Sequence, residues 1–274
     1  MSGVSSAVPV PGPPPAAPAY VRIVKGTKTY KSKRGDVLAL AEVDLEILQG
    51  EFLSIVGPSG CGKSTLMRCV AGLAPISGGE IQVKGARVDG PAKDLGIVFQ
   101  RDLLLDWRSV IDNVLLAVEF SGRAMPNARE RAVGILTKVG LGDFLDRYPW
   151  ELSGGMRQRA AICRALVTDP PALLMDEPFG ALDALTRDDL NAELQAVWME
   201  SRKTVLFITH SIGEAVFLSD RVAVMSPKPG RILETIDVDL PRPRALSVRD
   251  SPEFAKVTAR IRQVLASSGA IKAG

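Results

Sequence analysis

The feature that most constrains this chain is a glycine-rich segment between an apolar run and a helical pattern. The apolar run, Phe52-Leu53-Ser54-Ile55-Val56, has the composition of a buried strand. It leads into Gly57-Pro58-Ser59-Gly60-Cys61-Gly62-Lys63-Ser64, which fits the pattern G-x-x-x-x-G-K-[ST], and helical periodicity extends from Lys63 to Ala71. A strand, a glycine-rich turn and a helix in this order predict a cradle for phosphate.

Such a cradle has a defined chemistry. Glycines let successive backbone N–H groups turn toward one anion, and the positive end of the following helix points at the same group. Lys63 would add a point charge for the β- and γ-phosphates of a nucleotide, and the Ser64 hydroxyl would hold Mg²⁺. The alternative is a glycine-rich turn without a ligand, which the flanking strand and helix disfavour. The candidate nucleotide-binding residues are Gly57, Pro58, Ser59, Gly60, Cys61, Gly62, Lys63, Ser64 and Thr65.

A second apolar run ends in two carboxylates. Ala172-Leu173-Leu174-Met175 leads into Asp176 and Glu177, and Pro178 follows. Neighbouring residues at the end of a strand can have different roles, so Asp176 is a candidate Mg²⁺ ligand and Glu177 a candidate base for an attacking water. The alternative is a strand that runs into an acidic turn, and the upstream cradle disfavours it.

The order of predicted elements indicates an α/β fold. Between Arg101 and about Ala165 apolar residues recur at helical spacing, which predicts a helical lobe inserted into the α/β domain. Residues 1–20 are rich in Pro and Ala and predict a disordered tail without the features of a secretion signal. Pro252–Leu265 predicts a final amphipathic helix. Further strands are expected at Ile81–Val83, Leu95–Phe99, Val205–Thr209 and Val222–Met225.

Composition says more about the class and cellular compartment of the protein than about its function. Apolar residues make up 46% of the chain and charged residues 24%, which is ordinary for a globular protein, and a net charge of +3 gives no indication of nucleic-acid binding. Apolar stretches such as Val114–Val118 are far shorter than the roughly 18 residues that a membrane span needs. Cys61 and Cys69 bracket a predicted helix at a spacing of about 12 Å, beyond disulfide reach. We therefore expect a reducing compartment.

A third motif decides the class. Leu152-Ser153-Gly154-Gly155-Met156-Arg157-Gln158 precedes a helix that is expected to begin near Met156, so its serine and glycines form another anion-binding helix start. Here the chain resembles the ABC ATPase family, whose signature is LSGGQ; Met156 takes the fifth position, as in many importers. The resemblance implies a P-loop NTPase (RecA-like) core with an antiparallel β subdomain and an inserted α-helical subdomain. It also implies that Ser153, Gly154 and Gly155 bind the γ-phosphate of ATP held by a second, head-to-tail subunit.

The other elements of the family follow in order from Val21 to about Leu240. Gln100 matches the glutamine that reaches Mg²⁺ and the attacking water, and Asp183 matches the loop that crosses between paired sites. Tyr30 matches the aromatic residue that stacks on adenine, with a core or surface tyrosine as the alternative. His210, the only histidine, would usually be a surface or core residue, but its place after a strand matches the switch histidine. The family often has Asp next, and Ser211 there weakens the expectation of a helix cap.

Several stretches resemble the nitrate/sulfonate/taurine importer branch, notably Gly180–Arg187, Glu214–Val222 and Pro227–Ile232. That branch commonly has prolines where Asp102 and Asp106 stand here. The resemblance implies ATP and Mg²⁺ as cofactors, Glu177, His210 and Gln100 as catalytic residues, and Ser64, Gln100 and Asp176 as metal ligands. The expected domains are residues 21–245 for the ATPase, with the helical lobe at about 101–165, and 246–274 for a helical extension.

The resemblance also implies partners. These are a second ATPase subunit, an integral-membrane permease and, indirectly, a solute-binding protein, with no nucleic acid and a peripheral place at the cytoplasmic face of the inner membrane. Trp107 either packs in the helical lobe or lines a groove for the permease. Rival classes fit less well: a chromosome-organising ATPase would carry long heptad arms, a translation factor two cassettes, and an exporter fused membrane helices. An importer for another solute stays open, because this subunit need not touch the solute.

Overall fold

A computed structural model describes residues 18–33, 35–92 and 94–270 of the chain. Most of the tail expected at 1–20 lies outside these residues. Strand β1 begins at Ala19, two residues before the expected start of the ATPase domain at Val21, because Ala19 already pairs with Leu48 of the neighbouring strand.

The larger sheet carries the predicted buried strands in the order β10-β9-β3-β8-β7-β6. Five of these strands are parallel and β10 is an antiparallel edge. Every residue of β3, β7 and β8 is buried, because helices or the second sheet cover both faces. The carboxyl ends of the parallel strands therefore meet at one edge. The strands are β3 (Phe52–Val56), β6 (Leu95–Val98), β7 (Ala172–Asp176), β8 (Thr204–Thr209), β9 (Arg221–Met225) and β10 (Ile232–Asp237).

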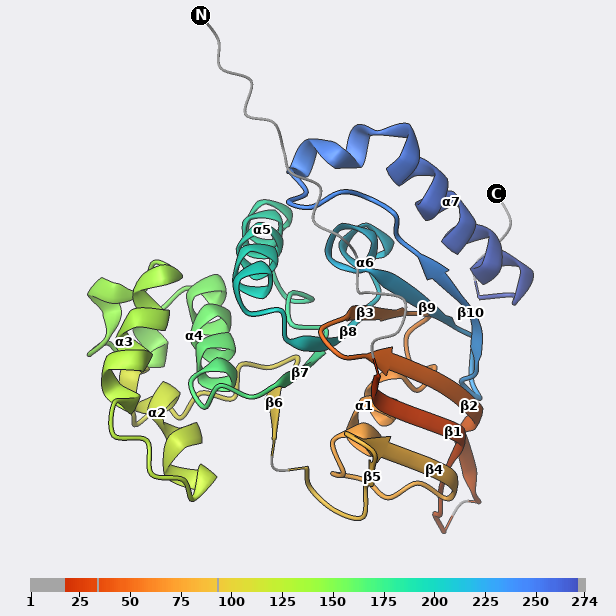
Figure 1. Cartoon of the computed structure of the whole chain (residues 1–274), viewed down its shortest axis with the longest axis horizontal. Helices are drawn as coiled ribbons and strands as arrows, with labels where there is room; N and C mark the ends of the chain where they lie inside the picture. The colour runs from red at the N-terminus through yellow and green to blue at the C-terminus, as the bar shows by residue number, and fades with distance from the viewer. Residues whose placement is uncertain (1–17, 34, 93, 271–274) are drawn as a thin grey trace, which may run out of the picture.

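The second sheet is antiparallel, in the order β2-β1-β4-β5. Residues 43–47 of β2 alternate between buried and exposed, as in a strand with one face on the core and one face in solvent. Helix α1 (Lys63–Val70) packs its Leu66, Met67 and Val70 into a core shared by the two sheets (Figure 1). The strands are β1 (Ala19–Tyr30), β2 (Val37–Leu48), β4 (Gly78–Val83) and β5 (Ala86–Arg87).

The inserted lobe between β6 and β7 is helical, as predicted. It forms a separate green and yellow layer at one side of the larger sheet in Figure 1, with its own core around Val114, Leu136 and Cys163. Helix α4 begins at Gly154, two residues before the expected Met156, because Ser153 caps it. The helices are α2 (Val110–Ser121), α3 (Ala128–Lys138) and α4 (Gly154–Leu166), with 3₁₀ turns at Gly142–Phe144 and Pro149–Glu151.

Three helices pack beyond the larger sheet on the side away from α1 (Figure 1). The final helix extends two residues past the predicted Leu265, and Ser251 caps its start. Among the described residues, no helix is long and apolar enough to cross a membrane. The elements are α5 (Ala184–Ser201), α6 (Ile212–Leu218), a 3₁₀ turn at Leu246–Asp250 and α7 (Pro252–Ser267).

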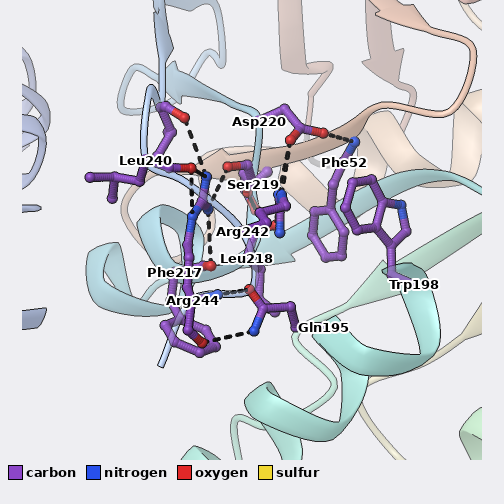
Figure 2. A network of polar contacts seen from close by, with 12 residues as sticks. Phe52, Gln195, Trp198, Phe217, Leu218, Ser219, Asp220, Leu240, Arg242 and Arg244 are labelled. Carbon is purple, nitrogen blue, oxygen red and sulfur yellow. Dashed lines mark hydrogen bonds and ion pairs between the residues drawn. The ribbon is translucent and has the colours of Figure 1, made fainter. Parts of the chain in front are cut away.

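Two buried arginines join this layer together (Figure 2). Residues 241–244, here called the arginine strap, connect β10 to the C-terminal elements. Arg244 is 3% exposed and donates to the carbonyls of Val216, Phe217 and Ser219 at 2.8–3.0 Å. Arg242 donates to the Leu218 carbonyl and to Asp220. Since the last carbonyls of a helix lack intrahelical donors, the strap supplies them for α6. Burial lowers the pKa of Arg244 to about 9.

Candidate active site

The glycine loop at 57–64 connects β3 to α1 at the carboxyl edge of the larger sheet. Gly62 has a φ of 116°, and a Cβ there would lie 2.9 Å from the Ala39 carbonyl oxygen of β2. Glycine is required at this position for both reasons. Cys61 is buried at 1% exposure, and burial raises the pKa of its thiol, which keeps the sulfur in the neutral form.

Lys63 lies buried behind the loop in the first turn of α1. Its Nζ donates to the carbonyl oxygens of Gly57 at 3.0 Å and Pro58 at 3.1 Å. The same ammonium is 3.6 Å from Oε1 of Glu177. These contacts hold a cation at the loop, where an incoming phosphate would meet it.

Ser64 and Asp176 meet although they are far apart in the chain. The Ser64 hydroxyl donates to Oδ1 of Asp176 at 2.8 Å. Burial raises the pKa of Asp176, while the Ser64 hydrogen bond acts in the opposite direction. A hydroxyl and a carboxylate are the hard oxygen donors that suit Mg²⁺. The described residues contain no cluster of three acidic, His or Cys side chains able to hold a metal. This donor set therefore fits an ion that takes its remaining oxygens from phosphate and water.

Glu177 and His210 form a carboxylate–imidazole pair beside Lys63. They follow the adjacent parallel strands β7 and β8, and His210 Nδ1 lies 3.1 Å from Oε2 of Glu177. Glu177 has a left-handed φ of 45°, and its backbone N–H donates to the Ile208 carbonyl at 2.8 Å. The side chain of His210 is about half exposed, whereas that of Glu177 is mostly buried. A carboxylate in this position can accept a proton, and the imidazole is able to hydrogen-bond an anion that enters from solvent.

Gln100 lies at the same edge, after β6, and is exposed. Within the described residues it makes no hydrogen bond to Ser64 or Asp176, so the structure does not bring it into the cluster. The loop that follows is fixed by Asp102, whose Oδ2 accepts from Nε of Arg157 on α4 at 3.1 Å. Arg157 also donates to the Leu152 carbonyl at 2.8 Å. The aspartate that departs from the importer pattern therefore ties the Gln100 loop to the start of α4.

Tyr30 ends β1 with its ring partly exposed. It pairs with Val37 of β2, the strand whose Ala39 and Leu40 contact Gly62. The Nζ of Lys28 lies 4.9 Å above the Tyr30 ring. The tyrosine is thus a surface residue near the loop rather than a core residue, a position compatible with stacking on a base.

The serine-glycine turn at 152–155 lies on the helical lobe. The Ser153 hydroxyl accepts from the Met156 N–H at 3.3 Å and caps α4, and Ser153 and Gly154 are exposed. Gly155 is buried, and a Cβ there would lie 2.7 Å from Cγ2 of Thr186. Asp183 caps α5 by accepting from the Thr186 N–H at 3.0 Å. Among the described residues, no hydrogen bond joins this turn to the 57–64 loop.

Some residues near the site were not found from the sequence. The sequence left the cap of α6 uncertain because Ser211 stands where the family often has Asp, and the structure shows that Ser211 does cap this helix, since its hydroxyl accepts from the Glu214 N–H at 3.3 Å. Thr209, Glu214 and Arg187 were not singled out, although all three contact loops of the site. The available signal was Glu214, a carboxylate within an otherwise apolar helical stretch, where a charged side chain is rarely buried without a partner.

Comparison with known proteins places this geometry in a family. The family model described as ABC transporter matches residues 40–180, from β2 through the glycine loop to the segment after Glu177. A taurine import ATP-binding protein of Rhizobium johnstonii is 48% identical over 85% of this chain and 90% of its own length. This chain belongs to the ABC transporter family. It is an ABC-type ATPase that resembles the nitrate/sulfonate/taurine importer branch.

Other relatives support the assignment of this chain, hereafter also called the cassette, to the ABC transporter family. The taurine import ATP-binding protein of Escherichia coli O157:H7 is 44% identical over 78% of the cassette and 86% of its own length. Among solved structures, a dimeric ATP-binding cassette in a post-hydrolysis state, bound to ADP and Pi, has a TM-score of 0.71 at 33% identity. The match covers 80% of this cassette and 99% of that chain. The predicted P-loop NTPase fold with its two subdomains is confirmed.

Proposed function

We propose that this cassette binds and hydrolyses ATP to energise import of taurine, a sulfonate, nitrate or a related small organic anion. The observation that supports this most is its 48% identity, over most of both chains, to a protein whose name is taurine import ATP-binding protein. An importer for another solute is the alternative.

The proposed roles of the site residues rest on the contacts at the sheet edge. Lys63 and the backbone of the 57–64 loop bind the β- and γ-phosphates, and Tyr30 stacks on the adenine. Ser64 and Asp176, joined at 2.8 Å, would hold Mg²⁺, and Gln100, which lies at the same sheet edge outside this pair, would be a further ligand; the ion would neutralise charge on the phosphates. Glu177 accepts a proton from the attacking water, and His210, 3.1 Å away, hydrogen-bonds the γ-phosphate.

The working unit in this proposal is a pair of identical chains arranged head to tail. Ser153, Gly154 and Gly155 of one copy complete the site around Lys63 of the other, and Asp183 lies beside the crossing between the two sites. The exposure of Ser153 and Gly154 supports this, as does the dimeric state of the ADP-bound solved relative. The start of a helix is a favourable place for a phosphate.

A groove between the core and the helical lobe is the proposed contact for a membrane permease. A cavity of about 420 Å³ lies between β6 and α2, and its lining includes Phe99, Leu103 and the largely exposed Phe120. Trp107 is 74% exposed, so it does not pack in the core of the lobe, and it is not among the residues that line this cavity. Exposed apolar side chains around a groove favour an apolar partner helix. The permease would hold the cassette at the cytoplasmic face of the inner membrane and connect it indirectly to a solute-binding protein, without nucleic acid.

Uptake measurements in the source organism test this function. Removal of the gene should abolish uptake of one anion among labelled taurine, alkyl sulfonates and nitrate, and the unmodified gene should restore it, whereas Glu177→Gln should not. Uptake of an unrelated amino acid serves as control. If removal of the gene abolishes uptake of a different solute only, the proposed anion is wrong but the ATPase proposal stands. If the purified chain does not retain Mg·ATP, the ATPase proposal itself is contradicted.

A further inference from the structure

The loop that carries His210 is held on both sides by one hydroxyl. Oγ1 of Thr209 accepts a hydrogen bond from the Ser211 N–H at 3.0 Å, so it spans the histidine between them. The same hydroxyl donates to Oε2 of Glu214, which lies in the first turn of α6 and is only 6% exposed. Glu214 therefore orients the Thr209 hydroxyl, which bridges from the residue before His210 to the backbone of the residue after it.

Arg187 connects this carboxylate to a second functional segment. Its Nε lies 3.4 Å from Oε1 of Glu214, and its Nη2 donates to the Leu182 carbonyl at 2.7 Å. Leu182 precedes Asp183, the cap of α5. A continuous polar path thus runs from the His210 loop through Thr209, Glu214 and Arg187 to the segment 181–183.

This path contains an unsatisfied contact. Nε of Arg187 is buried and has no hydrogen-bond acceptor, although the Glu214 carboxylate is only 3.4 Å away. A buried N–H without an acceptor is costly, and a short movement of α5, which carries Arg187, relative to α6 would turn the ion pair into a hydrogen bond. The pair is therefore suited to be looser in one state of the protein than in another.

We propose that Arg187 and Glu214 are positioning residues that couple the His210 loop of one ATP site to segment 181–183, and through it to the site of the second copy. This inference rests on the proposed head-to-tail pair. Neither residue is among those proposed to bind nucleotide; each would act through another residue, Glu214 through Thr209 on the His210 loop and Arg187 through the Leu182 carbonyl on segment 181–183.

The test compares Arg187→Gln, Glu214→Gln and the double variant in purified full-length chain. Each keeps a polar side chain of similar size and removes the charge. ATP hydrolysis measured against ATP concentration should be cooperative in the unmodified chain. In each variant we expect kcat to fall about tenfold and the Hill coefficient to fall toward 1, with binding of a fluorescent ATP analogue changed less than twofold. Because the two residues act as one pair, the double variant should lose no more than either single variant.

Matched controls separate coupling from a loss of stability. Glu234→Gln breaks a bidentate pair with Arg260, at 2.8 and 3.0 Å, that lies between β10 and α7. It should leave kcat and the Hill coefficient unchanged. If Arg187 and Glu214 had a purely structural role, the variants would lower the melting temperature and nucleotide binding while cooperativity stayed intact. This result would overturn the proposal. Independent losses of activity that multiply in the double variant would overturn it as well. Unmodified chain that binds no ATP would instead contradict the proposed function.

Discussion

The glycine loop at 57–64 and the serine-glycine turn at 152–155 each precede a helix, but the fold surrounds them differently. The loop has partners within the same chain: Lys63 contacts two carbonyls and Glu177, and Ser64 contacts Asp176. The turn has a capping bond from Ser153, packing at Gly155, and an exposed outer surface. The fold itself assembles one half of the proposed site, whereas our proposal requires a second chain to approach the other half. Binding and hydrolysis should therefore respond differently to changes in the two segments.

The largest expected effect separates hydrolysis from binding within the assembled half. Glu177→Gln removes the proposed base and keeps the shape of the side chain, so hydrolysis should fall about a thousandfold while ATP is retained. Phosphate release from purified chain and retention of a fluorescent ATP analogue measure the two quantities. Glu200→Gln, on the exposed surface, is the control. Near-normal turnover in Glu177→Gln would remove this residue from the role of base.

A smaller effect is expected on binding itself. Lys63→Ala removes a charged donor that contributes about 1.5–3 kcal/mol to a hydrogen bond with phosphate, which corresponds to roughly a 10- to 100-fold loss of nucleotide affinity. Titration with a fluorescent ATP analogue measures it. Lys138→Ala removes an exposed lysine that pairs with Glu200 and should bind normally. Equal affinity of the two variants would contradict the assignment of the loop as the phosphate site.

A change in the serine-glycine turn should lower hydrolysis and leave ATP binding by a single chain intact. Ser153→Ala and Ser251→Ala each remove an N-cap hydroxyl, from α4 and α7, so both should lose about 1 kcal/mol of stability. Only Ser153→Ala should also lower hydrolysis, by about tenfold, with ATP binding by a single chain unchanged. Thermal unfolding and phosphate release measure the two effects. If both variants hydrolyse ATP equally, the turn does not take part in the site.

The smallest effect concerns the link between the Gln100 loop and α4. Asp102→Asn keeps an acceptor for the Leu104 N–H but removes the charge that pairs with Arg157. Since both side chains are about one third exposed, we expect a loss of about 1 kcal/mol or less and a change in hydrolysis below about fivefold. Thermal unfolding and phosphate release measure these changes. A larger effect would mean that the loop positions Gln100 through this contact.

The same comparison explains what sequence reasoning achieved. The assembled half was predictable, because a buried strand that ends in a glycine loop or in two carboxylates must place those residues at one sheet edge. Glu177 and His210 follow the adjacent strands β7 and β8, and their side chains lie 3.1 Å apart. Local sequence patterns could not predict two contacts, the Arg187–Glu214 pair and the contact of β2 with Gly62. Each joins segments that are far apart in the chain and meet only through tertiary packing. For Gln100, Asp183 and the 152–155 turn, the roles stay predictions that a second chain must complete.

The arginine strap affects the order in which parts of the chain can fold during synthesis. The last carbonyls of α6, the helix that follows His210, are satisfied by Arg242 and Arg244, which lie some distance further along the chain. A nascent chain that has left the ribosome only as far as β10 lacks these donors and has an incomplete helix end. We therefore expect translation products that stop before residue 242 to contain the whole glycine loop but to leave α6, the helix that follows His210, incompletely folded.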